Sequence, residues 1–157
     1  VDTYAGRSDI LRLVALHELG GIYIDTDMMP LKSFKELLTD RPFIGLRSSK
    51  SFATGVIGCP AKHPAMRALI NSLPEWHASH RHNSASVQTG PAFVSSKWFG
   101  RTDINHLPVK TFYPYDGFMA PKRNERIQMF KDKQFPPEML AAHFSNHLWG
   151  GKPLDSR

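Results

Sequence analysis

The sequence has little of several features that would assign a protein class at once. Its 157 residues include a single cysteine, Cys59, so no intrachain disulfide can form and a disulfide-stapled secreted domain is excluded. It has no apolar run near the roughly 20 residues that a membrane-spanning helix needs. A charged fraction of 22% beside a hydrophobic fraction of 41% excludes a chain kept disordered by its charge. The sequence therefore predicts one globular domain in a reducing compartment, with Cys59 as a small, half-buried apolar side chain.

The charge balance favours anionic partners but does not choose among them. Lys and Arg number 20 against 14 Asp and Glu, which gives a net charge of +6. Such a surplus suits phosphates, nucleic acids or a membrane surface. Because basic and aromatic residues do not interleave on any one segment, we expect no nucleic-acid partner.

The first 27 residues have the order typical of an α/β protein. Ser8 is a suitable N-cap for a helix whose apolar positions, Ile10, Leu13, Val14 and His17, recur at helical spacing. Gly20 and Gly21 are expected to end that helix. A short, apolar, β-favouring segment at 22–24 then leads directly into acidic residues. In open α/β sheets, ligands bind at that end of a strand.

The remaining segments fit a mixed α/β domain with no internal repeats. We expect a strand at 54–57, a helix that begins at Pro64 and ends at Pro74, and a polar loop at 76–86 that carries three histidines. Further on we expect a short helix opened by Thr89-Gly90-Pro91, a strand at 109–113, a surface loop at 120–138, and an apolar segment at 139–142 that leads to His143.

Asp25-Thr26-Asp27 is the segment that indicates chemistry. Two carboxylates at positions i and i+2, placed where a buried strand ends, can share one hard cation such as Mg²⁺ or Mn²⁺. Such an ion keeps positions open for substrate phosphates. The alternative is a pair of solvated turn carboxylates. The apolar strand before them favours a metal, since half-buried carboxylates need a partner.

The same residues carry a resemblance to a known family. Arg7-Ser8-Asp9-Ile10-Leu11-Arg12, followed by Leu19-Gly20-Gly21-Ile22-Tyr23-Ile24-Asp25-Thr26-Asp27, resembles the signature of the DXD-containing, sugar-nucleotide-dependent glycosyltransferases. That family includes initiating α-1,6-mannosyltransferases and α-1,4-galactosyltransferases, and its core is similar to that of the large clostridial glucosylating toxins. Shorter matches follow at 54–58, 63–64, 89–91 and 112–114, and at His143 and Trp149.

The resemblance implies a fold and a metal site. The fold would be GT-A-like and Rossmann-related, a mixed sheet with flanking helices that apparently lacks its N-terminal strands. Asp27 would ligate Mn²⁺ or Mg²⁺ directly, and Asp25 would reach the ion through water or hold the donor's ribose. His143 would complete the site, with His147 as the alternative because the family's usual C-terminal pattern is altered here.

The resemblance also implies the substrate contacts. Asp9 and Arg12, one helical turn apart, would touch the donor sugar's hydroxyls and phosphate. The full set expected to bind substrate comprises Asp9, Arg12, Tyr23, Thr54, Gly90, Asn146 and Trp149. The donor would be a UDP- or GDP-sugar, and the acceptor a carbohydrate, glycolipid or protein.

The expected reaction is transfer of a hexose to a hydroxyl group with the anomeric configuration retained, catalysed with Asp25 and Asp27. Because the chain starts at Val1, only six residues before Arg7, we expect residues 1–157 to be a single glycosyltransferase-like domain from a larger catalytic domain. We expect a cytoplasmic location, with peripheral contact with a membrane left open. Two alternatives remain. One is a non-catalytic domain that binds carbohydrate. The other is an Asp-x-Asp phosphatase of the haloacid dehalogenase type, which Met29 disfavours because that motif has Thr or Val there.

Overall fold

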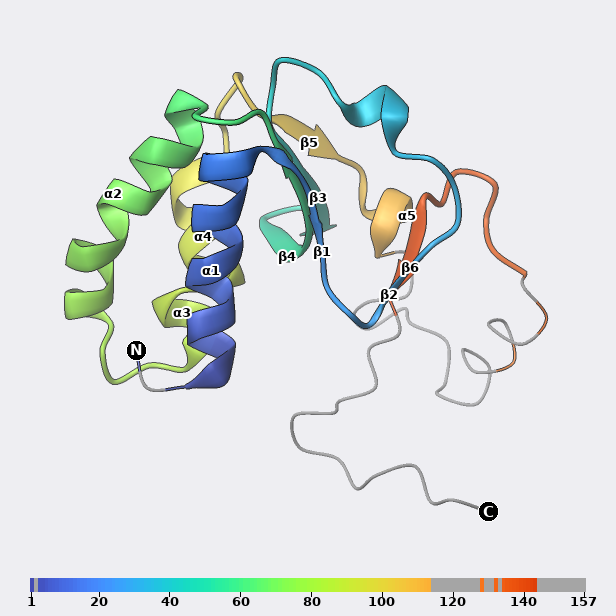
Figure 1. Cartoon of the computed structure of the whole chain (residues 1–157). Helices are drawn as coiled ribbons and strands as arrows, with labels where there is room; N and C mark the ends of the chain where they lie inside the picture. Colours follow the sequence, from blue (N-terminus) through green and yellow to red (C-terminus); the bar gives the residue numbers. More distant parts are fainter. Residues whose placement is uncertain (2, 114–127, 129–131, 133, 144–157) are drawn as a thin grey trace.

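The computed structural model describes residues 1, 3–113, 128, 132 and 134–143. Two sheets and five α-helices make up this part of the chain (Figure 1). The first sheet has the order β1-β4-β3-β5, built from Gly21–Ile24, Ser51–Cys59, Phe43–Ser48 and Asn105–Leu107. Strands β1 and β3 run antiparallel to β4, and β5 runs parallel to β3, so the sheet is mixed. The second sheet pairs β2, Met28–Pro30, antiparallel with β6, Ala141–His143.

Helices cover one face of the larger sheet. They are α1 (Tyr4–Leu19), α2 (Pro64–Ser79), α3 (Ala85–Gln88) and α4 (Pro91–Trp98), and Figure 1 shows them grouped together. The core on this side includes Leu13, Ile57 and Trp98, each about 1% exposed or less. The opposite side holds a second core, in which Phe43 and Val56 of the sheet pack with Met28, Tyr113 and residues near them. Helix α5 (Val109–Phe112) and the smaller sheet lie on that side. The expected α/β class, a mixed sheet with flanking helices, is confirmed.

Helix α1 begins earlier than the sequence predicted. Thr3, not Ser8, is the N-cap, and its Oγ1 accepts a hydrogen bond from the Gly6 N–H at 3.1 Å. Asp9 therefore lies in the helix interior rather than in its first turn. The predicted end is confirmed, because Gly20 caps the helix with φ 68°, a conformation that glycine adopts without strain.

The buried face of α1 also differs from the predicted apolar stripe. Leu13, Leu16 and His17 are buried, in line with the stripe, but so are Asp9 and Arg12, which were not on it. Val14, a position on the predicted stripe, is 40% exposed instead. Burial of an aspartate and an arginine costs free energy unless they are paired and hydrogen-bonded, so these two side chains must have partners inside the domain.

Several element predictions hold and others are wrong. Strand β1 and helix α4 lie where they were expected, and the strand at 54–57 is the centre of the longer β4. Strand β3 was not anticipated. The predicted break at Pro74 is wrong, because α2 continues to Ser79 with the proline inside it. The predicted loop at 76–86 is accordingly part helix, and the indole N–H of Trp76 donates to the Val87 carbonyl at 2.8 Å.

Residues 109–113 are helical rather than extended, despite their β-favouring composition. Val109–Phe112 form α5, and Phe112 and Tyr113 pack against the sheet where Gly45 leaves space for them. A Cβ on Gly45 would lie 2.7 Å from the Phe112 ring and 2.9 Å from the Tyr113 ring. Tertiary packing therefore overrides the local preference here. Most of the predicted loop at 120–138 lies outside the described residues.

Candidate functional site

The Asp25-Thr26-Asp27 segment forms a tight turn between the two sheets. The Asp25 N–H donates to the Gly55 carbonyl of β4 at 2.8 Å, which extends the pairing of β1 with β4 by one residue. The Met28 N–H then donates to the Asp25 carbonyl at 3.0 Å and closes the turn. Strand β2 starts at Met28 and pairs with β6. Each end of the turn is thus anchored to a different sheet, so the two carboxylates have different surroundings.

Asp25 is held by two side chains. Its Oδ1 accepts a hydrogen bond from the Tyr23 hydroxyl at 2.7 Å and lies 3.3 Å from Nη1 of Arg12. Gly55 leaves room for the other oxygen, since a Cβ there would lie 3.1 Å from both Asp25 Oδ2 and Tyr113 Oη. Burial and the hydrogen bond to Asp25 raise the pKa of Tyr23, so its hydroxyl stays a donor at neutral pH. The Asp25 side chain is 30% exposed.

Arg12 connects α1 to strands β1 and β4 and also pairs with Asp9 on its own helix. Its Nη1 donates to the Thr54 carbonyl at 2.6 Å, its Nη2 lies 3.0 Å from Asp9 Oδ1, and its guanidinium lies 4.5 Å from the centroid of the Tyr23 ring. The Arg12 side chain is only 8% exposed. A guanidinium presents a planar set of N–H donors, and here it joins two carboxylates and a carbonyl in one network.

Asp9 ends this network on the side of α3 and α4. The Thr89 hydroxyl donates to Asp9 Oδ2 at 3.0 Å. Gly90 lets the chain pass close to this carboxylate, because a Cβ there would lie 2.9 Å from the same oxygen. Burial is the largest influence on Asp9 and raises its pKa, while Arg12 and the Thr89 hydroxyl oppose that rise. The network Thr89–Asp9–Arg12–Asp25–Tyr23 is called the Arg12 network below.

Asp27 belongs to the second sheet and faces His143. Its Oδ2 lies 3.4 Å from His143 Nε2, and the side chains are 33% and 22% exposed. The register of β2 on β6 explains this proximity, since Met28 is paired with His143 and Asp27 is the next residue. The ring of Tyr113 meets the His143 ring edge to face at a centroid distance of 5.8 Å. His143 was predicted from the family resemblance, and the structure brings it to Asp27.

Asp27 and His143 can supply two ligands of a divalent cation, which is less than a complete coordination shell. Two ligands at about 2.1 Å on adjacent octahedral positions lie about 3 Å apart, close to the Asp27–His143 separation. Among the described residues, no group of three or more His, Cys, Asp or Glu side chains is arranged to hold a metal ion. An ion bound by one carboxylate and one imidazole would take its remaining ligands from water and substrate phosphates.

The predicted site residues therefore separate into two groups that meet at the turn. Asp9, Arg12, Tyr23 and Asp25 lie in the Arg12 network, with Thr54 joining through its carbonyl and Gly90 next to Asp9. Asp27 and His143 form the other group. Asn146, His147 and Trp149 lie outside the described residues.

Three residues near the site were not singled out from the sequence. Thr89, Gly55 and Tyr113 each lie in a short segment that contributed to the family resemblance, at 89–91, 54–58 and 112–114. Nothing in their local sequence distinguishes them, because their partners are distant in the sequence. Thr89 donates to Asp9, 80 residues away, and the Tyr113 hydroxyl accepts from the N–H of Val56, 57 residues away. Cys59 is buried, and desolvation raises its pKa to about 12, which fits the apolar role predicted for it.

Comparisons with known proteins agree with the predicted resemblance. Residues 2–44 match the family model described as a glycosyltransferase sugar-binding region containing the DXD motif. The chain is 28% identical over 94 residues to inositol phosphoceramide mannosyltransferase 3 of Schizosaccharomyces pombe, covering 59% of this chain and 26% of that protein. It is 23% identical over 158 residues to lactosylceramide 4-alpha-galactosyltransferase of Homo sapiens, covering 96% of this chain and 43% of that protein. The chain thus spans less than half the length of these two relatives.

A solved structure shares the fold. The structure entitled PaToxG Glycosyltransferase matches with a TM-score of 0.52 and 24% sequence identity, over 61% of this chain and 34% of that one. The matched family region contains α1, β1 and the whole Asp25–Asp27 turn. Residues 2–44 therefore match a glycosyltransferase sugar-binding region containing the DXD motif, and the resemblance predicted from the sequence is confirmed.

Proposed function

We propose that this chain contributes the donor site of a retaining, divalent-metal-dependent hexosyltransferase. The observation that carries the proposal is the pair Asp27–His143 at 3.4 Å, placed directly after an Asp25 that Arg12 and Tyr23 hold in position. A carboxylate oxygen of Asp27 and an imidazole nitrogen of His143 lie close together on partly exposed side chains, next to the turn where Arg12 holds Asp25. This arrangement suits a nucleoside diphosphate sugar, whose diphosphate needs positive charge and whose sugar needs polar contacts.

The proposed reaction moves a hexosyl group from a UDP- or GDP-sugar to a hydroxyl group. The bond between the anomeric carbon and the diphosphate oxygen breaks, a bond from that carbon to the acceptor oxygen forms on the same face, and the acceptor proton leaves to the departing phosphate or to solvent. A cation, Mn²⁺ or Mg²⁺, would neutralise charge on the departing diphosphate. Asp27 and His143 would hold it. We assign no residue as a general base.

The Arg12 network would position Asp25 and the donor sugar. Arg12 and Asp9 are the residues proposed to contact the donor sugar's hydroxyls and phosphate. Their mutual ion pair at 3.0 Å fixes both side chains before substrate arrives, which lowers the entropy cost of forming the site. Asp25 would reach the ribose or the ion through water, since its Oδ1 is already engaged by Tyr23 and Arg12. Asn146 and Trp149 stay predicted donor contacts.

Several wider properties are proposals as well. The two relatives named above carry lipid acceptors in their names, which supports a carbohydrate or glycolipid acceptor over a protein. This chain covers less than half of each of those relatives, which supports the proposal that residues 1–157 are a single glycosyltransferase-like unit within a larger catalytic domain. In the described part of the chain, no helix has both the length and the apolar character to cross a membrane. The +6 charge and the lipids in the relatives' names support action at a membrane surface, and the single cysteine supports a cytoplasmic location.

The test measures manganese-dependent release of nucleoside diphosphate from a panel of UDP- and GDP-sugars by the full-length protein. We expect Asp27→Asn to lower turnover at least about 100-fold while thermal unfolding stays unchanged. Asp40→Asn, on an exposed loop residue, is the matched control and should keep wild-type turnover. The electron spin resonance signal of Mn²⁺ should report weaker ion binding by Asp27→Asn alone.

Two results would contradict the proposal. One is turnover by Asp27→Asn near that of the wild type. The other is wild-type turnover that persists in excess chelator. Wild-type protein that binds nucleotide sugars or glycans calorimetrically without turning them over would instead support the non-catalytic alternative.

A further inference from the structure

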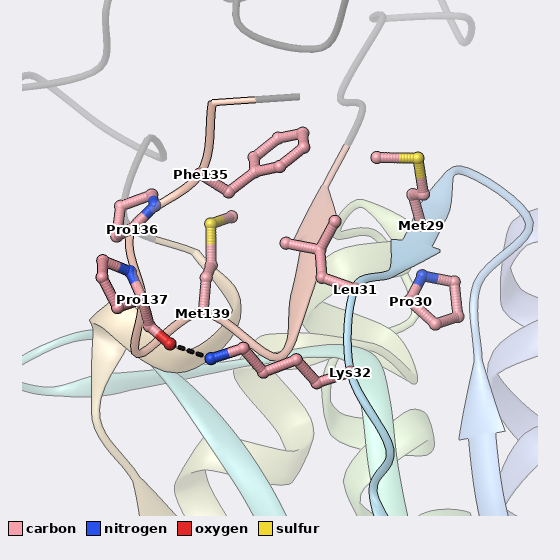
Figure 2. A pocket seen from close by; sticks show the side chains of 8 residues that line it. All are labelled: Met29, Pro30, Leu31, Lys32, Phe135, Pro136, Pro137 and Met139. Atoms are coloured by element: carbon pink, nitrogen blue, oxygen red, sulfur yellow. Dashed lines mark hydrogen bonds between the residues drawn. The ribbon is translucent and has the colours of Figure 1, made fainter. Parts of the chain in front are cut away.

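An apolar pocket lies beside the smaller sheet, with a volume of about 450 Å³. Two chain segments line it, 29–32 and 135–139, and Figure 2 shows their side chains facing one another across the pocket. Methionine, proline, leucine and phenylalanine make up most of the lining. Among the described residues that form its wall, Lys32 alone carries a charge, and its ammonium donates to the Pro137 carbonyl across the pocket.

The smaller sheet joins the pocket to the candidate active site. Strand β2 leads from Asp27 to the wall at Met29 and Pro30, and β6 leads from the wall at Met139 to His143. Past the strands, the backbone N–H groups of Leu31 and Lys32 donate to the Leu140 carbonyl, so the two segments stay joined at the pocket. A three-residue strand pair is about 10 Å long. The Asp27–His143 pair therefore lies at one end of this short sheet, and the pocket extends from the middle of the sheet past its other end.

The chemistry of the lining selects an apolar ligand. A sugar-binding pocket needs several side-chain donors and acceptors, whereas this wall offers thioethers, a leucine and prolines. Methionine side chains adapt to flexible hydrocarbon because the unbranched thioether has three rotatable bonds. The volume falls in the range of small-molecule sites, about 300–1,000 Å³. Met29 is 36% exposed at the rim, so the pocket can be entered from solvent.

We propose that this pocket binds the alkyl chain of a lipid-linked acceptor while the acceptor's hydroxyl group lies at the Asp27 end of the sheet. This inference rests on the proposed function for its catalytic consequence, but the pocket itself can be tested without turnover. The distance of about 10 Å between the two ends leaves room for the sugar of the acceptor between the reacting hydroxyl and the alkyl chain.

The first experiment detects binding directly in the full-length protein. Methionine methyl groups labelled with ¹³C are titrated with octyl glucoside below its micelle concentration and with methyl glucoside. We expect the signals of Met29 and Met139 to shift with octyl glucoside only. Met28 and Met66 are buried in the two cores and act as internal references. Burial of two methylenes alone contributes about 15-fold in affinity, so octyl glucoside should bind at least about tenfold more tightly.

A variant pair then locates the binding. Met29→Gln should weaken octyl glucoside binding about tenfold. Leu11→Gln also replaces an apolar side chain by glutamine, but at an exposed position on α1, and it should leave binding unchanged. In turnover assays, wild-type protein should prefer octyl over methyl glycosides of the same sugar by at least about tenfold in kcat/KM. Met29→Gln should lose most of that preference, whereas Leu11→Gln should keep it.

The outcomes separate this inference from the proposed function. Equal turnover of octyl and methyl glycosides, or equal effects of the two variants, would overturn the alkyl pocket and leave the transferase intact. Equal shifts of all methionine methyl groups would likewise overturn it as non-specific detergent binding. Specific shifts at Met29 and Met139 in a protein without turnover would support the pocket while the proposed function fails.

Discussion

Replacement of Arg12 by methionine is the sharpest test of how the site is held together. Arg12 is 7% exposed and meets Asp9 at 3.0 Å, Asp25 at 3.3 Å and the Thr54 carbonyl at 2.6 Å. Methionine keeps much of the side chain's length and apolar volume but removes the charge and every donor. Among the described residues, Asp9 would then be left buried with the Thr89 hydroxyl as the remaining partner of its carboxylate.

The expected loss is a large share of the domain's stability. Removal of one partner from a buried ion pair costs about 3–5 kcal/mol, because the remaining charge is uncompensated. Domains of this kind have unfolding free energies of about 5–15 kcal/mol. With a urea m-value of about 2 kcal/mol/M, a loss of 4 kcal/mol lowers the urea midpoint by about 2 M. The measurement is urea unfolding followed by circular dichroism.

The control and a double mutant define what would refute the reasoning. Arg7→Met changes an exposed arginine on the same helix and should shift the midpoint by less than about 0.3 M. Asp9→Asn combined with Arg12→Met should cost at least about 1 kcal/mol less than the sum of the single changes, since no buried charge then lacks a partner. If Arg12→Met and Arg7→Met shift the midpoint equally, Arg12 does not hold this part of the fold.

Two further predictions concern the cores. Burial raises the pKa of Cys59 to about 12 from the reference of 9.0, so its thiolate should be about 1,000-fold scarcer than in the unfolded chain. Iodoacetamide at pH 8 should therefore label Cys59 at least about 100-fold more slowly in buffer than in urea, as measured by mass spectrometry. Similar labelling rates in the two conditions would contradict its burial. Gly58→Ala places a methyl group in steric overlap with the edge of the Phe43 ring, so we expect about 1–3 kcal/mol of destabilisation by urea unfolding. Addition of Phe43→Leu should recover part of that loss, and a neutral Gly58→Ala would show that the two strands are not packed as described.

The order of elements around the motif could be predicted from the sequence because local signals there agree with the fold. Glycines end α1, an apolar triplet forms β1, and the acidic residues follow at once. Thr89-Gly90-Pro91 likewise marks the start of α4. At these positions the local backbone preference alone predicts where a helix begins or ends, because the conformation that glycine or proline favours is the one observed.

Elements that depend on distant contacts could not be predicted in this way. Segment 109–113 has strand-favouring residues, yet it is helical because Phe112 and Tyr113 pack over Gly45, more than 60 residues earlier. Pro74 signals a helix end, but Trp76 beyond it packs against the core and bonds the Val87 carbonyl, which keeps α2 helical to Ser79. A local preference of about 1 kcal/mol is smaller than the burial of one aromatic side chain.

The two acids of the motif show where sequence spacing stops being informative. Their i, i+2 separation predicted that both would serve one ion, and nothing in that spacing distinguishes them. The two sheets distinguish them instead. Asp25 follows β1 and contacts Arg12 of α1. Asp27 precedes β2 and contacts His143 of β6, which is 116 positions later in the sequence. A carboxylate already paired with a guanidinium is a poorer metal ligand, since its charge is partly neutralised before an ion arrives. Asp27 is therefore the acid whose loss should abolish ion binding, while loss of Asp25 should first disturb the Arg12 network.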